Sequence, residues 1–179
     1  MIRKKSWIAF LPIVFLACNF LFPQDQGPVS STPTPAPAQT TESSTDSNAS
    51  SAFTISRIHK TDGDLMTLLN AEAMKAQEMG RKPFLEFDAT WCPPCIAIDK
   101  SINAKDPQTL QAFSGIYLIR ADVEEWGWGD GKNFTVDAIP VYYELSENGQ
   151  PTGRSINGGA WNEDIPENFA PVLDTFFHQ

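Results

Sequence analysis

Two cysteines separated by two prolines stand where the sequence predicts that a strand passes directly into a helix. The apolar run 83–88 is typical of a buried central strand, and Ile96, Ile98 and Ile102 continue a helix after the pair. Proline at the first helical positions removes no hydrogen bond, because N–H groups there have no intrahelical partner. The segment 83–102 therefore predicts one strand–turn–helix unit, around which the rest of the chain must fold.

Cys92 and Cys95 have the spacing at which two thiols that open a helix can close into a disulfide and reopen. The unpaired N–H groups and the positive end of the helix dipole stabilise a thiolate on the first cysteine. Such placement lowers a thiol pKa from about 8.5 to about 3.5–7.5. We therefore expect redox chemistry, with Cys92 as nucleophile and Cys95 as resolving thiol. Their immediate surroundings are Trp91, Pro93 and Pro94.

Charge and cysteine count exclude two classes of protein. The 179 residues carry a formal net charge of −9, whereas binding of nucleic acid requires a basic face that neutralises phosphates. We therefore predict a solvated acidic surface and no nucleic-acid partner. The three cysteines provide one pair and one further residue, Cys18, so a scaffold of several disulfides is excluded.

Residues 1–22 have the layout of an export signal. Three basic residues at positions 3–5 precede an uncharged run, 7–22. Within that run, the residues from Phe15 to Cys18 resemble a bacterial lipobox, in which the cysteine is lipidated and becomes the mature N-terminus. An uncleaved membrane anchor and ordinary signal cleavage are the alternatives, although about 16 apolar residues are fewer than the ~20 needed to span a bilayer.

Residues 23–52 predict a disordered tether between this segment and a folded domain at 53–179. The tether is rich in Pro, Ser, Thr, Ala and Gln and contains no aromatic residue before the domain begins, so it cannot bury a core. The predicted protein is therefore exported, to the periplasm or the cell surface, and attached to a membrane through its N-terminus.

The folded segment predicts the element order β-α-β-α-β-β-β-α, with room for a short helix in the glycine- and tryptophan-rich loop 124–131. Because a helix connects them, the second and third strands should be parallel. The sequence Glu147-Asn148-Gly149 indicates a hairpin turn between the last two strands. Strands are expected near 53–58, 83–88, 117–122, 139–145 and 152–156. Helices are expected near 64–79, 92–102 and 169–177, with a further helical turn at Pro107.

Three motifs in this order resemble the thioredoxin superfamily. Trp91-Cys92-x-x-Cys95 is similar to its active-site signature, Ile139-Pro140 is placed like its cis-proline, and Gly159-Ala160 is similar to its glycine turn before the last helix. The resemblance implies an α/β thioredoxin fold, with a central mixed sheet flanked by helices. It also implies that Pro140 and Ile139 pack against the active-site disulfide.

Within that superfamily, residues 82–92 and the later Asp106-Pro107-Gln108 most resemble the C-terminal periplasmic domain of the thiol reductase DsbD. The resemblance implies a buried acid beneath the disulfide at Glu86, six residues before Cys92. The superfamily usually has aspartate there, and lysine or another residue where Arg120 stands. We expect burial to raise the pKa of Glu86 and an inward-turned Arg120 to oppose that rise.

The function that these features predict is that of an extracytoplasmic thiol–disulfide oxidoreductase that reduces protein disulfides. Its partners would be protein thiols and disulfides, together with a membrane electron donor that re-reduces the cysteine pair. No cofactor is required. The opposite direction, disulfide oxidation, is an alternative, because residues between the two cysteines shift thiolate stability either way.

Several other interpretations are open at this stage. Zinc binding would need four ligands, and beyond the cysteines only His59 and His178 are available, both expected on the surface. Copper delivery is a closer alternative, because soft thiolates select Cu(I). Glu86 could instead lie at a sheet edge, and Pro140 could be a trans residue. Trp126 and Trp128 could pack in the domain or form a substrate platform.

Overall fold

The computed structural model describes residues 52–179. Cys18, the predicted export segment 1–22 and nearly all of the predicted tether 23–52 lie outside the described residues, so the expectations for them stay predictions. Within the described part, no helix is both long enough and apolar enough to cross a membrane.

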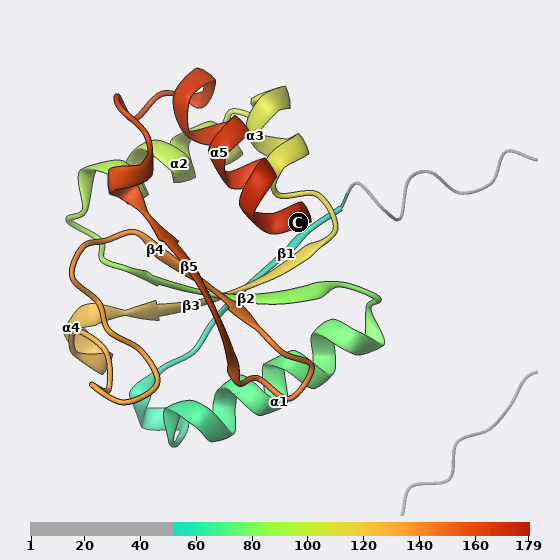
Figure 1. The fold of residues 1–179 in the computed structure, drawn as a ribbon, viewed down its shortest axis with the longest axis vertical. Helices are drawn as coiled ribbons and strands as arrows, with labels where there is room; N and C mark the ends of the chain where they lie inside the picture. Colours follow the sequence, from blue (N-terminus) through green and yellow to red (C-terminus); the bar gives the residue numbers. More distant parts are fainter. Residues whose placement is uncertain (1–51) are drawn as a thin grey trace, which may run out of the picture. The chain divides into compact units, whose positions relative to one another are not determined.

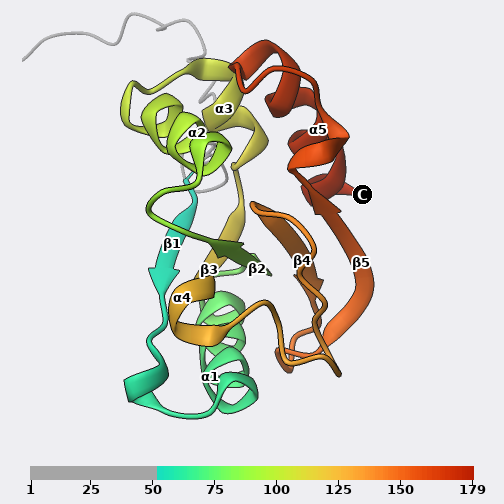
Figure 2. The same ribbon diagram turned by 90° about the vertical axis from the view of Figure 1, so that its left-hand side faces the viewer.

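A five-stranded mixed sheet forms the centre of the domain, in the order β1-β3-β2-β4-β5. β1, β3 and β2 run parallel, whereas β4 lies antiparallel to both β2 and β5. The strands can be followed across the sheet in this order in Figure 2. Their bounds are Thr54–Arg57 for β1, Lys82–Asp88 for β2, Ile116–Asp122 for β3, Val141–Leu145 for β4 and Pro151–Asn157 for β5.

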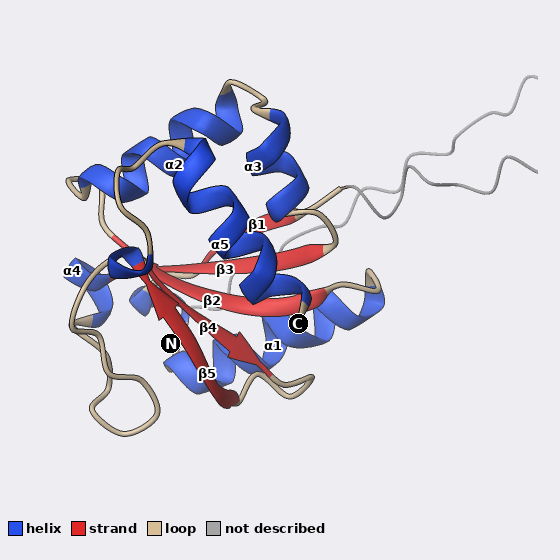
Figure 3. Ribbon diagram, turned by 45° about the horizontal axis from the view of Figure 1, so that its top comes forward, coloured by secondary structure: helices blue, strands red, loops and turns tan. Residues whose placement is uncertain are grey.

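Helices cover both faces of this sheet (Figures 1 and 3). α1 covers one face, and α2, α3 and α5 cover the other, while α4 follows β3 directly. The bounds are Leu65–Glu78 for α1, Pro93–Asn103 for α2, Pro107–Ala112 for α3, Val123–Trp126 for α4 and Pro166–His178 for α5. Two 3-10 turns, Lys60–Asp62 and Gly158–Ala160, complete the elements.

The alternation of side chains along the strands divides the core in two. Leu85 and Phe87 of β2 pack on the side of α1, in a cluster that also contains both cysteines. Phe84 points to the other face, where its ring centroid lies 4.8 Å from that of Phe177 in α5. Every residue of β2 after Lys82 is buried, which explains why its sequence lacks a polar alternation.

The predicted order of elements is confirmed, with small differences at the boundaries. β4 starts at Val141, because Pro140 has no N–H with which to enter the ladder. The expected hairpin turn between β4 and β5 includes Gly149, whose φ is +70°. A Cβ atom there would lie 2.5 Å from the backbone of Leu69, so this turn packs too closely on α1 for any other residue.

Candidate functional site

The end of the sheet at which β2 stops gathers the predicted active-site segments. In the register, Phe87 lies opposite Ala121 of β3 and opposite Val141 of β4, and Val141 lies opposite Asn157 of β5. The start of α2, the segment that enters β4 and the end of β5 therefore meet at one edge, which is the left side of Figure 1.

Cys92 and Cys95 form a disulfide across the first turn of α2, with their Cα atoms 5.3 Å apart. Cys92 is the N-cap, and its Sγ accepts a hydrogen bond from the backbone N–H of Cys95 at 3.3 Å. Pro93 and Pro94 occupy the first two helical positions, as predicted. Neither proline carries an N–H, so the Cys95 N–H is the donor that this helix end points at the Cys92 sulfur, and together with the positive end of the helix dipole it favours a thiolate there when the bond is reduced.

The disulfide is covered while Trp91 beside it is open to solvent. Cys92 is 1% exposed and Cys95 5%, whereas Trp91 is 52% exposed. The indole N–H of Trp91 donates to Glu124 at the start of α4, over 3.0 Å. In the disulfide form, Cys92 is therefore almost fully covered.

The peptide bond between Ile139 and Pro140 is cis, as the sequence resemblance implied. The backbone N–H of Gly158 donates to the Pro140 carbonyl over 2.9 Å, which joins the turn before α5 to the start of β4. Ile139 is partly buried and packs against the hydrophobic cluster that contains both cysteines. The cis bond is therefore confirmed, and the packing of Pro140 against the disulfide, like its role in the reaction, stays a prediction.

A row of four polar side chains crosses the sheet. Arg57 of β1, Arg120 of β3, Glu86 of β2 and Tyr142 of β4 are successive partners in the register, so their side chains share one face. That face is the one covered by α2, which adds Asp99 to the group.

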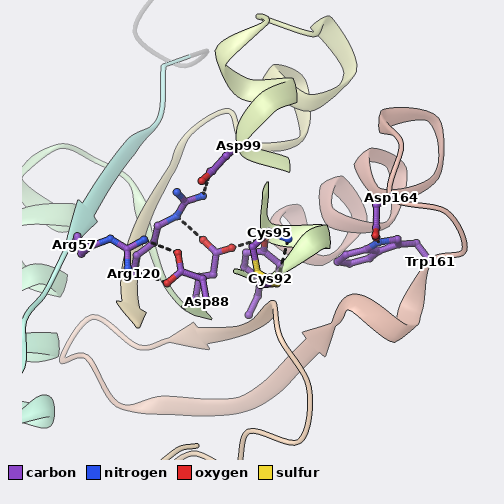
Figure 4. Close-up of a disulfide and its surroundings, with 10 residues drawn as sticks. Arg57, Asp88, Cys92, Cys95, Asp99, Arg120, Trp161 and Asp164 are labelled. Atoms are coloured by element: carbon purple, nitrogen blue, oxygen red, sulfur yellow. Dashed lines mark hydrogen bonds and ion pairs between the residues drawn. A yellow bond between two sulfur atoms is a disulfide. The ribbon is translucent and has the colours of Figure 1, made fainter. Parts of the chain in front are cut away.

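Glu86 is completely buried, as expected, and both of its oxygens have partners. Arg120 donates from Nε to Oε2 at 2.6 Å, and the Tyr142 hydroxyl donates to Oε1 at 2.9 Å. Arg120 also reaches Asp99 on α2, with Nη2 2.7 Å from Oδ1. Figure 4 shows the Arg120 side chain reaching Asp99. Arg120 therefore does turn inward, and it links the buried acid to a half-exposed one.

Burial and charge act in opposite directions on these groups. Burial raises the pKa of Glu86, and the charge of Arg120 offsets part of that rise. Burial opposes the charge on Arg120, but the carboxylates of Glu86 and Asp99 outweigh it and raise the Arg120 pKa. Burial also raises the pKa of Tyr142 well above its ordinary value. Arg120 and Tyr142 thus keep their protons, and Glu86 is the group in the row whose protonation can change.

Three features decide the architecture. Three parallel strands, β1, β3 and β2, are followed in the sheet by the antiparallel β4; the cysteine pair comes directly after the central strand β2; and a cis-proline precedes β4. The chain has a thioredoxin fold. No protein-family model and no curated protein matches the sequence.

Solved structures similar to the chain are themselves thioredoxin-fold proteins. A disulphide isomerase from Xylella fastidiosa Temecula1 is 19% identical, with a TM-score of 0.45 over 65% of this chain and 90% of its own. Thioredoxin from Trichomonas vaginalis is 23% identical, with a TM-score of 0.39 over 57% and 84%. Oxidized thioredoxin O1 from Arabidopsis thaliana is 16% identical, with a TM-score of 0.41 over 69% and 98%.

Sequence reasoning missed four members of this site: Arg57, Asp88, Asp99 and Tyr142. Arg57 donates to the buried Asp88 through both terminal nitrogens, and the distance from Nη1 to Oδ1 is 2.9 Å. This ion pair lies next to the one between Arg120 and Glu86. One signal could have found Asp88, because it lies two residues after Glu86 in a strand and so shares its face. Asp99 likewise follows Cys95 by one helical turn.

The remaining candidates lie away from the disulfide or on the surface. His59 and His178 are exposed, as expected, and contact Glu125 and Asp174 respectively. Trp126 is partly buried and donates to the Ile58 carbonyl, whereas Trp128 is 53% exposed. Within residues 52–179, no group of three or more His, Cys, Asp or Glu side chains is arranged to hold a metal ion.

Proposed function

We propose that this protein is a thiol–disulfide oxidoreductase that reduces protein disulfides through Cys92 and Cys95. The observation that carries the proposal is the disulfide at the N-terminus of α2, the helix that covers the face of the sheet where the fully buried Glu86 carboxyl group lies. These features supply the three requirements of the reaction, which are a stabilised thiolate, a neighbouring thiol and a proton acceptor.

The reaction starts from the dithiol form. The Cys92 thiolate attacks one sulfur of the substrate disulfide, which forms a mixed disulfide and releases the other substrate sulfur as a thiolate. Cys95 then loses its proton and attacks the Cys92 sulfur, which breaks the mixed disulfide. Two electrons pass to the substrate, which takes up two protons and leaves as a dithiol, and the Cys92–Cys95 disulfide remains.

Glu86 is the proposed acceptor of the Cys95 proton. A carboxyl group whose pKa is raised toward the working pH takes up a proton more readily than an ordinary carboxylate does. Arg120 and Tyr142 each hold one oxygen, and each oxygen can accept a second hydrogen bond. The proton can therefore be received without breaking either contact.

The proposal for location rests on the N-terminal sequence, and the proposal for electron supply rests on the resemblance to DsbD. The export-like segment, the lipobox-like Cys18 and the tether support an extracytoplasmic, membrane-attached domain. The likeness to the C-terminal domain of DsbD supports re-reduction by a dithiol on a membrane electron donor. We expect full-length protein in the membrane fraction, with release of a Cys18→Ala variant. Full-length protein in the soluble extracytoplasmic fraction would contradict the attachment.

A Cys95→Ser variant tests the reaction. Because the resolving thiol is absent, the mixed disulfide on Cys92 should persist, and its partner can be identified by mass spectrometry. Cys92→Ser is the matched control and should trap nothing. Capture by Cys92→Ser alone would reverse the two roles. A redox potential near about −120 mV, as in strong oxidants, rather than near about −270 mV, as in thioredoxin, would contradict the reducing direction.

A further inference from the structure

The loop between α4 and β4 is built to hold a fixed shape. The Asp130 carboxylate accepts the backbone N–H groups of Lys132, Asn133 and Phe134. Although partial burial acts the other way, these bonds lower the pKa of Asp130 to about 2. Gly129, with φ +86°, pairs with Thr135, and a Cβ on it would lie 2.4 Å from the Phe134 carbonyl oxygen. The Asp130 carboxylate therefore serves to fix the backbone of its own loop.

Alternation along the last part of this loop directs two side chains outward. Phe134 and Val136 are buried in the core cluster that contains the cysteines, so Thr135 and Asp137 between and after them are exposed. The Tyr143 hydroxyl donates to the Thr135 carbonyl and ties this stretch to β4. The position of Asp137 is therefore set by an anchored backbone rather than by a free loop.

Thr135 and Asp137 line a cavity of about 380 Å³ together with residues of β4, β5 and the turn before α5. Val141, which follows the cis-proline, and Gly159, in the glycine turn, also line it. Gly158 packs close to Pro140, where an added Cβ would lie 3.3 Å from the proline ring. The cavity therefore adjoins the start of β4, directly after the cis-proline.

Asp137 is the charged residue of this cavity, whose other polar side chains are neutral, including Thr135, Ser155 and Asn157. Among the described residues, no cationic side chain forms an ion pair with Asp137. A negative group at the wall of a polar cavity favours a cationic occupant. Hydroxyl and amide groups around it can complete the hydrogen bonds of an ammonium or guanidinium group.

We propose that this cavity is a specificity pocket for a lysine or arginine side chain of the substrate polypeptide, close to the disulfide that Cys92 attacks. The proposal rests on the proposed function and adds a substrate class to it: disulfides flanked by a basic residue. Asp137 is the residue that determines the preference, and the loop 127–138 serves to hold it at the edge of the site.

Three peptides with the same internal disulfide test the proposal. They differ only in the residue next to the attacked cysteine, which is Lys, Gln or Glu. The reduced full-length chain is mixed with each peptide, and the second-order rate constant is measured in a single turnover at low and high salt. The variants are Asp137→Asn, Asp137→Lys and Glu163→Gln. Glu163 is an exposed acid in the segment between the turn Gly158–Ala160 and α5, and it does not line the cavity.

The wild-type chain should reduce the Lys peptide about two- to fivefold faster than the Glu peptide at low salt, and the ratio should shrink as salt screens the charge. Asp137→Asn should bring the ratio close to one, Asp137→Lys should invert it, and Glu163→Gln should keep it. An unchanged ratio in Asp137→Asn, or an equal loss in Glu163→Gln, would overturn the proposal. Failure of the wild type to reduce the Gln peptide would instead contradict the proposed function itself.

Discussion

Two arginine–carboxylate pairs lie side by side in the sheet, and they differ mainly in depth. The outer pair joins Arg57, whose side chain is 36% exposed, to Asp88, which is 6% exposed. The inner pair joins Arg120, at 9%, to Glu86, at 0%. The inner pair joins the neighbouring strands β3 and β2, whereas the outer pair reaches from β1 across β3 to β2, and Arg57 and Arg120 are partners in the register.

Depth changes what the same chemistry can do. The outer arginine faces water, which screens the pair and solvates its charge. The inner carboxyl is removed from water, so burial raises its pKa and its charge depends on Arg120. The outer pair is therefore suited to fixing β1 to β2 across β3. The inner pair is suited to accepting and releasing a proton.

Removal of the inner cation should have the largest effect. Arg120→Leu leaves Glu86 buried without its charge partner and should lower the free energy of unfolding by about 3–5 kcal/mol. Arg57→Leu, the matched control, should cost only about 1–3 kcal/mol, because Asp88 stays closer to solvent. Urea unfolding of both variants measures the difference. Equal losses would mean that depth does not separate the two pairs.

The loss in Arg120→Leu should also depend on pH. Without Arg120, the folded-state pKa of Glu86 rises further above its unfolded value of about 4.3. A carboxyl group whose pKa is higher in the folded state stabilises that state fully at a pH below the unfolded pKa. This stabilisation is lost as pH rises through the folded pKa. The variant should therefore be less stable, relative to wild type, at pH 8 than at pH 5.

Replacing the carboxylate of each pair by an amide should separate the two pairs in reaction kinetics. Glu86→Gln keeps a partner for Tyr142 but removes the proton acceptor, so resolution of the mixed disulfide should slow by about tenfold to hundredfold. The first attack by Cys92 should change little. Asp88→Asn, the control in the outer pair, should leave resolution within about twofold. Rapid mixing with a model disulfide across roughly pH 6–9 measures both steps; unchanged resolution in Glu86→Gln would reduce Glu86 to a structural residue.

The smallest expected effect is that of the hydroxyl on the far side of Glu86. The hydrogen bond from Tyr142 lowers the Glu86 pKa, so Tyr142→Phe should raise it and move the midpoint of the resolution profile to higher pH by about one unit or less. Tyr143→Phe loses only its bond to Thr135 and serves as control. The same midpoint in all three proteins would show that Tyr142 does not act through Glu86.

Local chemistry explains how much of the fold could be predicted. The Asp64 cap of α1, the prolines that open α2 and α3, and the apolar run of β2 act through neighbours in the sequence, and the predicted elements lie where these signals put them. The burial of Glu86 was predictable for the same reason, because apolar residues surround it in a central strand. The cis bond before Pro140 was foreseen only through resemblance to a family.

By itself, then, the sequence determined the elements, the cysteine pair at the start of a helix and the buried acid in the strand before it. Tertiary structure alone decided which groups surround that acid. Arg120 and Tyr142 are far apart along the chain and contact Glu86 only because strand order and register set them beside it, with Arg57 next to Arg120 in the same row. The cavity at Asp137 likewise needs a loop, two strands and a turn at once, and no local pattern encodes contacts between segments so distant in sequence.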